Sequence, residues 1–186
     1  MPPPSIRTVK QIIYYQYAKI ITEASGIFKG DPMFYRMVMS RCNKLCSGEL
    51  TWSTARREWQ KEFDNPNVCI YCGASSKLTI EHILPRSCGG EDIADNCVRV
   101  CGPCNSSKNG RRLYEWRGLE AKDDHHHIAE GKYLKYLYGL HEKRGTLDIS
   151  NIADLCAACN LGQRCTDEGH ESKLTVYCIE GCFKKS

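Results

Sequence analysis

The chain has 186 residues, of which 41% are hydrophobic and 26% are charged, so it can bury a core and wholesale disorder is excluded. Its 26 Lys and Arg residues against 22 Asp and Glu residues leave a formal net charge of +4, which permits a polyanionic partner without requiring one. No apolar run reaches the roughly 18–20 residues that cross a bilayer, and the first residues lack the apolar stretch of a signal peptide. We therefore expect a cytoplasmic protein without a membrane partner.

The first 66 residues are expected to form a helical N-terminal region. Residues 7–24 contain no Gly or Pro and place apolar side chains at helical spacing. A second helix is expected to start at Pro32, because Pro is favoured at the first helical position, and to end before Gly48. A third, charged helix is expected over residues 54–63.

The character of the chain changes in residues 67–120. Two β-like runs, 78–83 and 98–100, lie between pairs of cysteines, and a segment from Asn105 onward can form a helix. This pattern predicts a small mixed domain in an otherwise helical protein.

The last third divides into two further segments. Residues 121–150 are expected to be helical, with one helix over 128–144, and residues 151–186 to form a small Cys-rich tail with a β-like run over 173–177. The expected fold class is therefore α+β and mostly helical.

The chain contains thirteen cysteines, an odd number that, without an export signal, argues for metal-binding thiolates rather than a disulfide framework. Cys69-x-x-Cys72 and Cys101-x-x-Cys104 are separated by 28 residues. Two such tight pairs are the usual ligand supply of a tetrahedral structural zinc ion. The sequence therefore predicts a four-Cys zinc site.

The segment between these pairs carries a recognisable motif. Its residues are Ile80-Glu81-His82-Ile83-x-Pro85-Arg86-Ser87-x-Gly89-Gly90, then Asn96, then Cys101-x-x-Cys104-Asn105-x-x-Lys108. His82 precedes Asn96 by fourteen positions, and Asn96 precedes Asn105 by nine. Over about residues 69–116 the chain resembles the HNH nuclease family. The resemblance implies a ββα-metal core, two short strands and a helix around one catalytic cation.

The resemblance and the chemistry of phosphodiester hydrolysis suggest a role for each motif residue. His82 is expected to be the general base, because its ordinary pKa lies near neutrality. Glu81 and Asn105 are oxygen donors suited to a catalytic Mg²⁺ or Mn²⁺ ion, and Asn96 is expected to pin the loop that bears His82. Adjacent strand residues point to opposite faces, so Glu81 and His82 need a bend to serve one centre, which the Pro85 loop could supply.

Basic residues follow the motif and suggest contacts to a nucleic acid. Lys108 matches a family position and is expected to contact phosphate. Arg111 and Arg112 are candidates for the same role, with a solvated helix face as the equal alternative.

The tail offers ligands for a second zinc ion, with an iron–sulfur cluster as the alternative. The candidate thiolates are Cys156, Cys159, Cys178 and Cys182. Cys165 and His170 compete with them, and the spacing does not choose four ligands from the six. The remaining cysteines are interpreted as ordinary buried thiols: Cys42, Cys46, Cys88 and Cys97. As an alternative, Cys42 and Cys46 could join a distant pair of metal ligands.

These features together predict a metal-dependent HNH-type endonuclease that hydrolyses DNA, with structural zinc and catalytic Mg²⁺ or Mn²⁺. One alternative is a zinc-stabilised nucleic-acid-binding module without turnover, and another is a nuclease for RNA or structured junctions. Because one site cuts one strand, cleavage of both strands would imply a homodimer.

Overall fold

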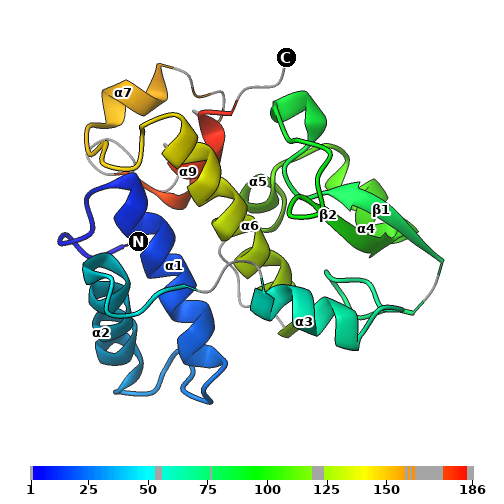
Figure 1. Ribbon diagram of the computed structural model, residues 1–186, viewed down its shortest axis with the longest axis horizontal. Helices are drawn as coiled ribbons and strands as arrows, with labels where there is room; N and C mark the ends of the chain where they lie inside the picture. Colours follow the sequence, from blue (N-terminus) through cyan, green and yellow to red (C-terminus); the bar gives the residue numbers. More distant parts are fainter. Residues whose placement is uncertain are drawn as a thin grey trace. The chain divides into compact units, whose positions relative to one another are not determined.

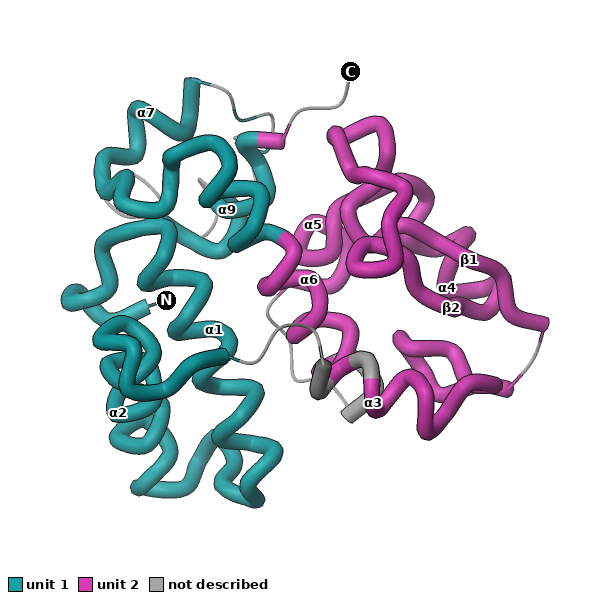
Figure 2. The backbone as a smooth tube through the Cα atoms, viewed as in Figure 1, with its two compact units in different colours: residues 1–52, 137–182 teal, residues 53–136, 183–186 magenta. Residues whose placement is uncertain are grey.

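The structure is a computed structural model, and it describes residues 2–52, 56–75, 77–118, 124–157, 159, 161 and 174–183. It divides into two compact units (Figure 2). The helical unit comprises residues 1–52 and 137–182, and the hairpin unit comprises residues 53–136 and 183–186. Among the described helices, none has the length and apolar character needed to cross a membrane.

This division differs from the four consecutive segments expected from the sequence. Helix α6 (Asp124–Lys143) is continuous, and residues on either side of position 136 belong to different units. A boundary inside a regular helix leaves no Gly- or Pro-rich linker, so the sequence carries no signal of it.

Two antiparallel helices begin the helical unit, α1 (Val9–Glu23) and α2 (Phe34–Ser47), and they pack side by side (Figure 1). Thr8 caps α1: its hydroxyl accepts from the Gln11 N–H at 3.2 Å, while the Gln11 side chain accepts from the Thr8 N–H at 3.1 Å. Helix α2 ends at Gly48, whose φ of 80° favours glycine. Both predicted helices are present, but α2 begins two residues after the expected start at Pro32, with Met33 at its N-cap.

Aromatic rings and two short helices complete the helical unit. Tyr14 stacks on Tyr138 with ring centroids 5.5 Å apart, and Trp52 meets both rings edge-on. Helix α7 (Ile152–Cys156) packs on α9 (Val176–Gly181), and α9 also contacts α1.

The β-like run expected over 173–177 is wrong where the structure describes it. Val176 and Tyr177 open α9, with Thr175 at its N-cap, and both side chains are buried. A short apolar run does not distinguish a strand from a buried helical turn, and packing on α1 and α7 decides here. Lys173 lies outside the described residues.

In its described residues the hairpin unit contains one antiparallel sheet of two strands, β1 (Leu78–His82) and β2 (Cys97–Cys101), as predicted. The first strand starts opposite the end of the second, and His82 pairs with Cys97. Helix α4 (Gly102–Lys108) follows β2 directly and packs on both strands (Figure 1). It begins three residues earlier than the helical segment expected from Asn105, because Pro103 suits the first helical turn.

Three shorter elements belong to the same unit. Helix α3 (Arg56–Asp64) precedes the first Cys pair, the 3₁₀ turn η1 (Arg86–Cys88) lies in the loop between the strands, and α5 (Leu113–Arg117) follows α4. The unit therefore has two strands and a helix in the order ββα, with helices on either side in the sequence.

His141 on α6 is fully buried, whereas its Lys and Glu neighbours in the sequence indicate a surface position. Its Nε2 lies 2.9 Å from the Ile179 carbonyl, which fixes the proton on this nitrogen, and its Nδ1 lies 2.7 Å from the Thr146 hydroxyl. Burial lowers the pKa of His141 to about 4, from an ordinary value of 6.5.

We expect His141 to make the helical unit sensitive to acid. The unfolded chain binds this proton below pH 6.5 and the folded chain only near pH 4, so stability is complete above pH 6.5 and is lost as the pH falls to 4. The linked loss is about 3 kcal/mol. Urea unfolding at pH 7 and pH 4.5 should show a smaller difference for His141→Gln than for the native chain. Equal differences would contradict the assignment.

Candidate functional site

Four cysteine thiols gather at one end of the hairpin. The sulfur atoms of Cys69, Cys72, Cys101 and Cys104 all lie within 4.8 Å of one another, and the Cys72 and Cys101 sulfurs are 3.7 Å apart. A tetrahedral zinc ion with Zn–S bonds of about 2.3 Å places its sulfurs about 3.8 Å apart. The cluster therefore has the composition and spacing of a structural zinc site.

The backbone around the cluster is ordered by hydrogen bonds. The Cys69 N–H donates to the Ala74 carbonyl and the Gly73 N–H to the Cys69 carbonyl, both at 2.8 Å, which closes the first turn. The Ile70 N–H donates to the Arg99 carbonyl at 3.0 Å and ties this turn to β2. Burial raises the pKa of the Cys104 thiol, so a cation is the natural partner for a thiolate at this position.

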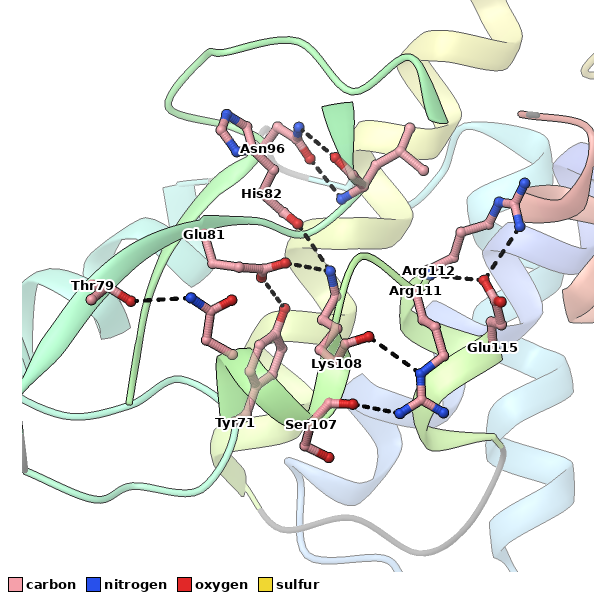
Figure 3. A network of polar contacts seen from close by, with 12 residues as sticks. Tyr71, Thr79, Glu81, His82, Asn96, Ser107, Lys108, Arg111, Arg112 and Glu115 are labelled. Atoms are coloured by element: carbon pink, nitrogen blue, oxygen red, sulfur yellow. Dashed lines mark hydrogen bonds and ion pairs between the residues drawn. The ribbon is translucent and has the colours of Figure 1, made fainter. Parts of the chain in front are cut away.

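The Glu81 carboxylate lies in a polar network on the face of β1 that is turned to α4 (Figure 3). The Tyr71 hydroxyl donates to its Oε2 at 3.0 Å, and the Lys108 ammonium forms an ion pair with its Oε1. The same ammonium donates to the His82 carbonyl at 3.0 Å. Burial and the Glu81 charge raise the pKa of Tyr71 well above its usual value, which keeps this hydroxyl a donor.

Asn105 lies on the same face as this network. Its amide nitrogen donates to the Thr79 hydroxyl at 3.4 Å (Figure 3). Thr79 and Glu81 are two residues apart on a strand, and Asn105 and Lys108 are three apart on a helix, so each pair shares one face. The structure thus places Glu81 and Asn105 on the same side of β1, which faces α4.

The His82 imidazole points to the other side of β1 from the Glu81 carboxylate (Figure 3). Its Nε2 lies 3.0 Å from Asp92 Oδ1, and the two side chains are 22% and 73% exposed. The hydrogen bond to His82 lowers the pKa of Asp92, so this carboxylate is ionised and accepts from Nε2–H. The Pro85 loop does not turn Glu81 and His82 to one side, because both residues lie inside the regular strand.

Asn96 fixes the loop between the strands. It is fully buried; its Oδ1 accepts from the Leu84 N–H at 2.9 Å, and its Nδ2 donates to the carbonyls of Leu84 at 3.0 Å and Glu91 at 2.9 Å. Gly90 allows this close approach, since a Cβ there would lie 1.9 Å from the Leu84 carbonyl oxygen and 2.8 Å from Asn96 Nδ2. These hydrogen bonds set the path of the loop that carries Asp92.

The basic residues expected to contact phosphate all have partners within the protein. Lys108 and Arg112 are fully buried, the first on Glu81 and the second with its Nε donating to the Phe183 carbonyl at 3.0 Å. Arg111 is half-buried, and its Nε donates to the Lys108 carbonyl at 3.2 Å at the end of α4. Helix C-termini offer carbonyls without an internal partner, which explains the position of Arg111.

Four cysteines of the tail lie within the described residues: Cys156, Cys159, Cys178 and Cys182. Burial followed by the charges of its neighbours Cys178 and Cys159 raises the pKa of Cys156, so these thiols interact. In the described part of the chain, however, they do not gather as closely as the four-Cys cluster. Cys165 and His170 lie outside the described residues.

Sequence reasoning missed two residues of the site. Tyr71 lies inside the first C-x-x-C turn, and Asp92 lies in the loop between the strands. Neither has a signal of its own in the sequence, because an aromatic residue between zinc ligands and an acidic residue in a loop are both common. Only their hydrogen bonds to Glu81 and His82 identify them.

Comparison with known proteins agrees with this geometry. Residues 69–113 match the family model described as HNH endonuclease. The chain is similar to the "Type IV methyl-directed restriction enzyme EcoKMcrA" of Escherichia coli (strain K12), with 34% identity over 26% of this chain and 22% of that protein. The chain thus spans less than a quarter of the length of this curated relative. No solved structure matches the chain significantly.

The loop geometry predicts that Gly90→Ala destabilises the hairpin unit. The added methyl group collides with the Leu84 carbonyl and the Asn96 amide, and overpacking of this kind costs about 1–3 kcal/mol. Gly102→Ala is the matched control, since a Cβ there meets nothing within 4 Å. Thermal unfolding should show a lower midpoint for Gly90→Ala only. Equal midpoints for the two variants would contradict the described loop path.

Proposed function

From the premise that residues 69–113 are an HNH endonuclease domain, we propose that the chain is a metal-dependent endonuclease that hydrolyses DNA phosphodiester bonds. The observation that carries the proposal is the division of polar groups around β1. Oxygen donors from Glu81 and Asn105 occupy one face, and the His82 imidazole with its Asp92 partner leaves the strand on the other side.

The donor set on the α4 side fits a hard divalent cation. A carboxylate and an amide carbonyl are oxygen ligands of the kind that Mg²⁺ and Mn²⁺ prefer, and no imidazole or thiolate joins them on this face in the described residues. Glu81 and Asn105 would hold this ion. When bound, it would stabilise the charge that develops on the phosphate and the leaving oxygen.

Lys108 and Tyr71 are proposed as positioning residues for Glu81. Each donates to a different oxygen of the carboxylate, and a carboxylate has about four lone-pair sites, so both bonds leave acceptor capacity for a cation. Residues of this kind orient a metal ligand without touching the substrate. This role replaces the phosphate contact that the sequence suggested for Lys108.

His82 is proposed as the general base. The Asp92 carboxylate accepts from Nε2–H, which leaves the lone pair on Nδ1 to take a proton from the attacking water. In-line hydrolysis needs the attacking and leaving oxygens on opposite sides of phosphorus. The opposite directions of His82 and Glu81 suit this requirement, because a base and a metal ligand then serve different sides of one phosphate.

Two exposed arginines are better placed for phosphate contact than the buried Lys108 and Arg112. Arg86, on η1, and Arg99, on β2, are exposed within the hairpin unit. Salt-dependent attraction to the phosphate backbone requires cations that water and DNA can reach. DNA as the substrate is further supported by the relative's description as a restriction enzyme.

The fold proposed for the hairpin unit is the ββα-metal core, stapled by zinc at the four-Cys cluster. A second structural zinc ion is proposed for the tail, with ligands from Cys156, Cys159, Cys178 and Cys182. Interaction among these thiols and the N–H···S contact from Thr175 to Cys178 at 3.3 Å support it, because such contacts are common around zinc-bound sulfur.

Zinc analysis of the purified chain is expected to give close to two ions. Cys104→Ser should lose about one of them and unfold the hairpin unit, because three ligands do not close a structural site. Cys178→Ser should lose the other, whereas Cys88→Ser, with a buried thiol outside both clusters, should keep both. A zinc content near one ion per native chain would contradict the tail site, and a content near zero would contradict both proposed zinc sites.

Plasmid cleavage tests the proposed activity. With Mg²⁺ or Mn²⁺ the native chain should convert supercoiled DNA to nicked or linear product, and His82→Ala should lose about 10²–10⁴-fold of this rate. The Glu81→Gln variant should need a metal concentration roughly tenfold higher or more to reach its half-maximal cleavage rate. His127→Ala, a histidine on α6, is the matched control.

Equal cutting by the native chain and His82→Ala would contradict the assignment of the base. DNA binding without cutting by any variant would favour the zinc-stabilised binding module instead. Single-stranded RNA and branched DNA run beside the plasmid would reveal a different substrate.

A further inference from the structure

Three side chains of different chemistry meet on the side of the hairpin away from Glu81. The ligand atoms of His82, Asp92 and Cys97 all lie within 4.8 Å of one another. His82 Nε2 is 3.0 Å from Asp92 Oδ1, and the Cys97 sulfur is 3.6 Å from the same oxygen. The catalytic role proposed for His82 uses Asp92 and leaves Cys97 without a function.

The backbone holds this group in place. His82 and Cys97 are directly opposite each other in the antiparallel pair, so their Cβ atoms share one face about 4.5–5.5 Å apart. Asp92 follows Glu91, whose carbonyl accepts from Asn96 and whose N–H donates to the Tyr136 hydroxyl at 2.8 Å. The third ligand therefore lies on a fixed loop rather than on a loose one.

The spacing suits a tetrahedral transition ion. With bonds of about 2.0 Å to nitrogen and oxygen and about 2.3 Å to sulfur, the N···O edge is about 3.3 Å and the O···S edge about 3.5 Å. The observed 3.0 and 3.6 Å differ from these edges by a few tenths of an ångström. Asp92 is exposed, so water can supply the fourth ligand.

The charges around these three side chains are compatible with a bound cation. The charge of Arg86 acts on Asp92, but this side chain is exposed, so water and salt screen it. Lys132 donates to the Cys97 carbonyl at 2.7 Å and pairs with Glu62 at 2.8 Å. Its charge is thus largely offset by Glu62, and the ionised Asp92 supplies the negative charge at the site itself.

We propose that His82, Asp92 and Cys97 form a separate site for zinc or a similar borderline transition ion, and that its occupation inhibits DNA cleavage. The site takes a different class of ion from the Glu81 face, because imidazole and thiolate favour Zn²⁺ or Co²⁺ over Mg²⁺. The proposed metal binding does not depend on the proposed nuclease function, whereas the proposed inhibition rests on the role of His82 as general base.

Metal binding would inhibit DNA cleavage because it moves the proton on the His82 ring. In the free site Nε2 carries the proton and Nδ1 the lone pair that accepts from water. Coordination uses the Nε2 lone pair, the ring proton moves to Nδ1, and Cys97 releases its thiol proton to solvent. Nδ1–H is a donor and no longer a base, so metal bound at Nε2 stops the proton transfer while leaving the fold intact.

Cobalt spectroscopy tests the binding half without any activity assay. Chain already loaded with structural zinc is titrated with Co²⁺, and the thiolate-to-cobalt charge-transfer band is measured. The native chain should show this band, and the Cys97→Ser variant should lack it. The Asp92→Ala variant should form the band only at a Co²⁺ concentration about tenfold higher or more. Cys46→Ser, a half-buried thiol in the helical unit, should keep the band. A band of equal strength in Cys97→Ser would overturn the site.

Zinc titration of Mg²⁺-dependent plasmid cleavage tests the inhibition half. Cys97→Ser should cut at the native rate without zinc and need at least about tenfold more zinc for half-inhibition. Equal inhibition of both chains would overturn the link between this site and His82. If the native chain cuts no DNA at any zinc concentration, the proposed nuclease function fails, and the cobalt band still decides whether the site exists.

Discussion

The close approach of four cysteine sulfur atoms, all within 4.8 Å of one another, is the constraint on which the hairpin unit depends. The first Cys pair encloses Tyr71, which donates to Glu81, and the second pair joins the end of β2 to the start of α4, which carries Asn105 and Lys108. Without a cation, four thiols this close together offer little stabilisation to so small a sheet. The zinc ion proposed for this cluster would therefore also set the geometry of the Glu81 face.

The two sides of β1 divide the chemistry. On the α4 side, Tyr71 and Lys108 both donate to the Glu81 carboxylate, and Lys108 also donates to the His82 carbonyl. This is the side on which we propose a hard divalent cation. The other side carries His82, the proposed general base, whose side chain is 22% exposed against 11% for Glu81. This arrangement follows from the twofold period of a strand, in which neighbouring residues cannot share a face. In the proposed mechanism, the adjacent Glu81 and His82 therefore serve opposite sides of one phosphate.

The sequence predicted the Cys pairs, the two strands and the first three helices, because each depends on local spacing, capping or turn chemistry. It predicted a strand at Val176–Tyr177, where packing on α1 and α7 produces a helix. It also predicted a phosphate contact for Lys108, because a lysine in a motif helix gives no indication of burial. Its ion pair with Glu81 depends on how α4 crosses β1. Asp92 was missed for the same reason, since its contact with His82 depends on the path of a loop fixed by Asn96 and Gly90.

Manganese binding to zinc-loaded and zinc-depleted chain, followed by the electron paramagnetic resonance signal of free Mn²⁺, tests the central claim most directly. If the four-Cys cluster sets the Glu81 face, the zinc-loaded chain binds one Mn²⁺ ion that Glu81→Gln weakens, and depletion of zinc weakens native binding by about tenfold or more. Equal Mn²⁺ affinity with and without zinc would show that the Glu81 face forms independently of the cluster, and would contradict the account.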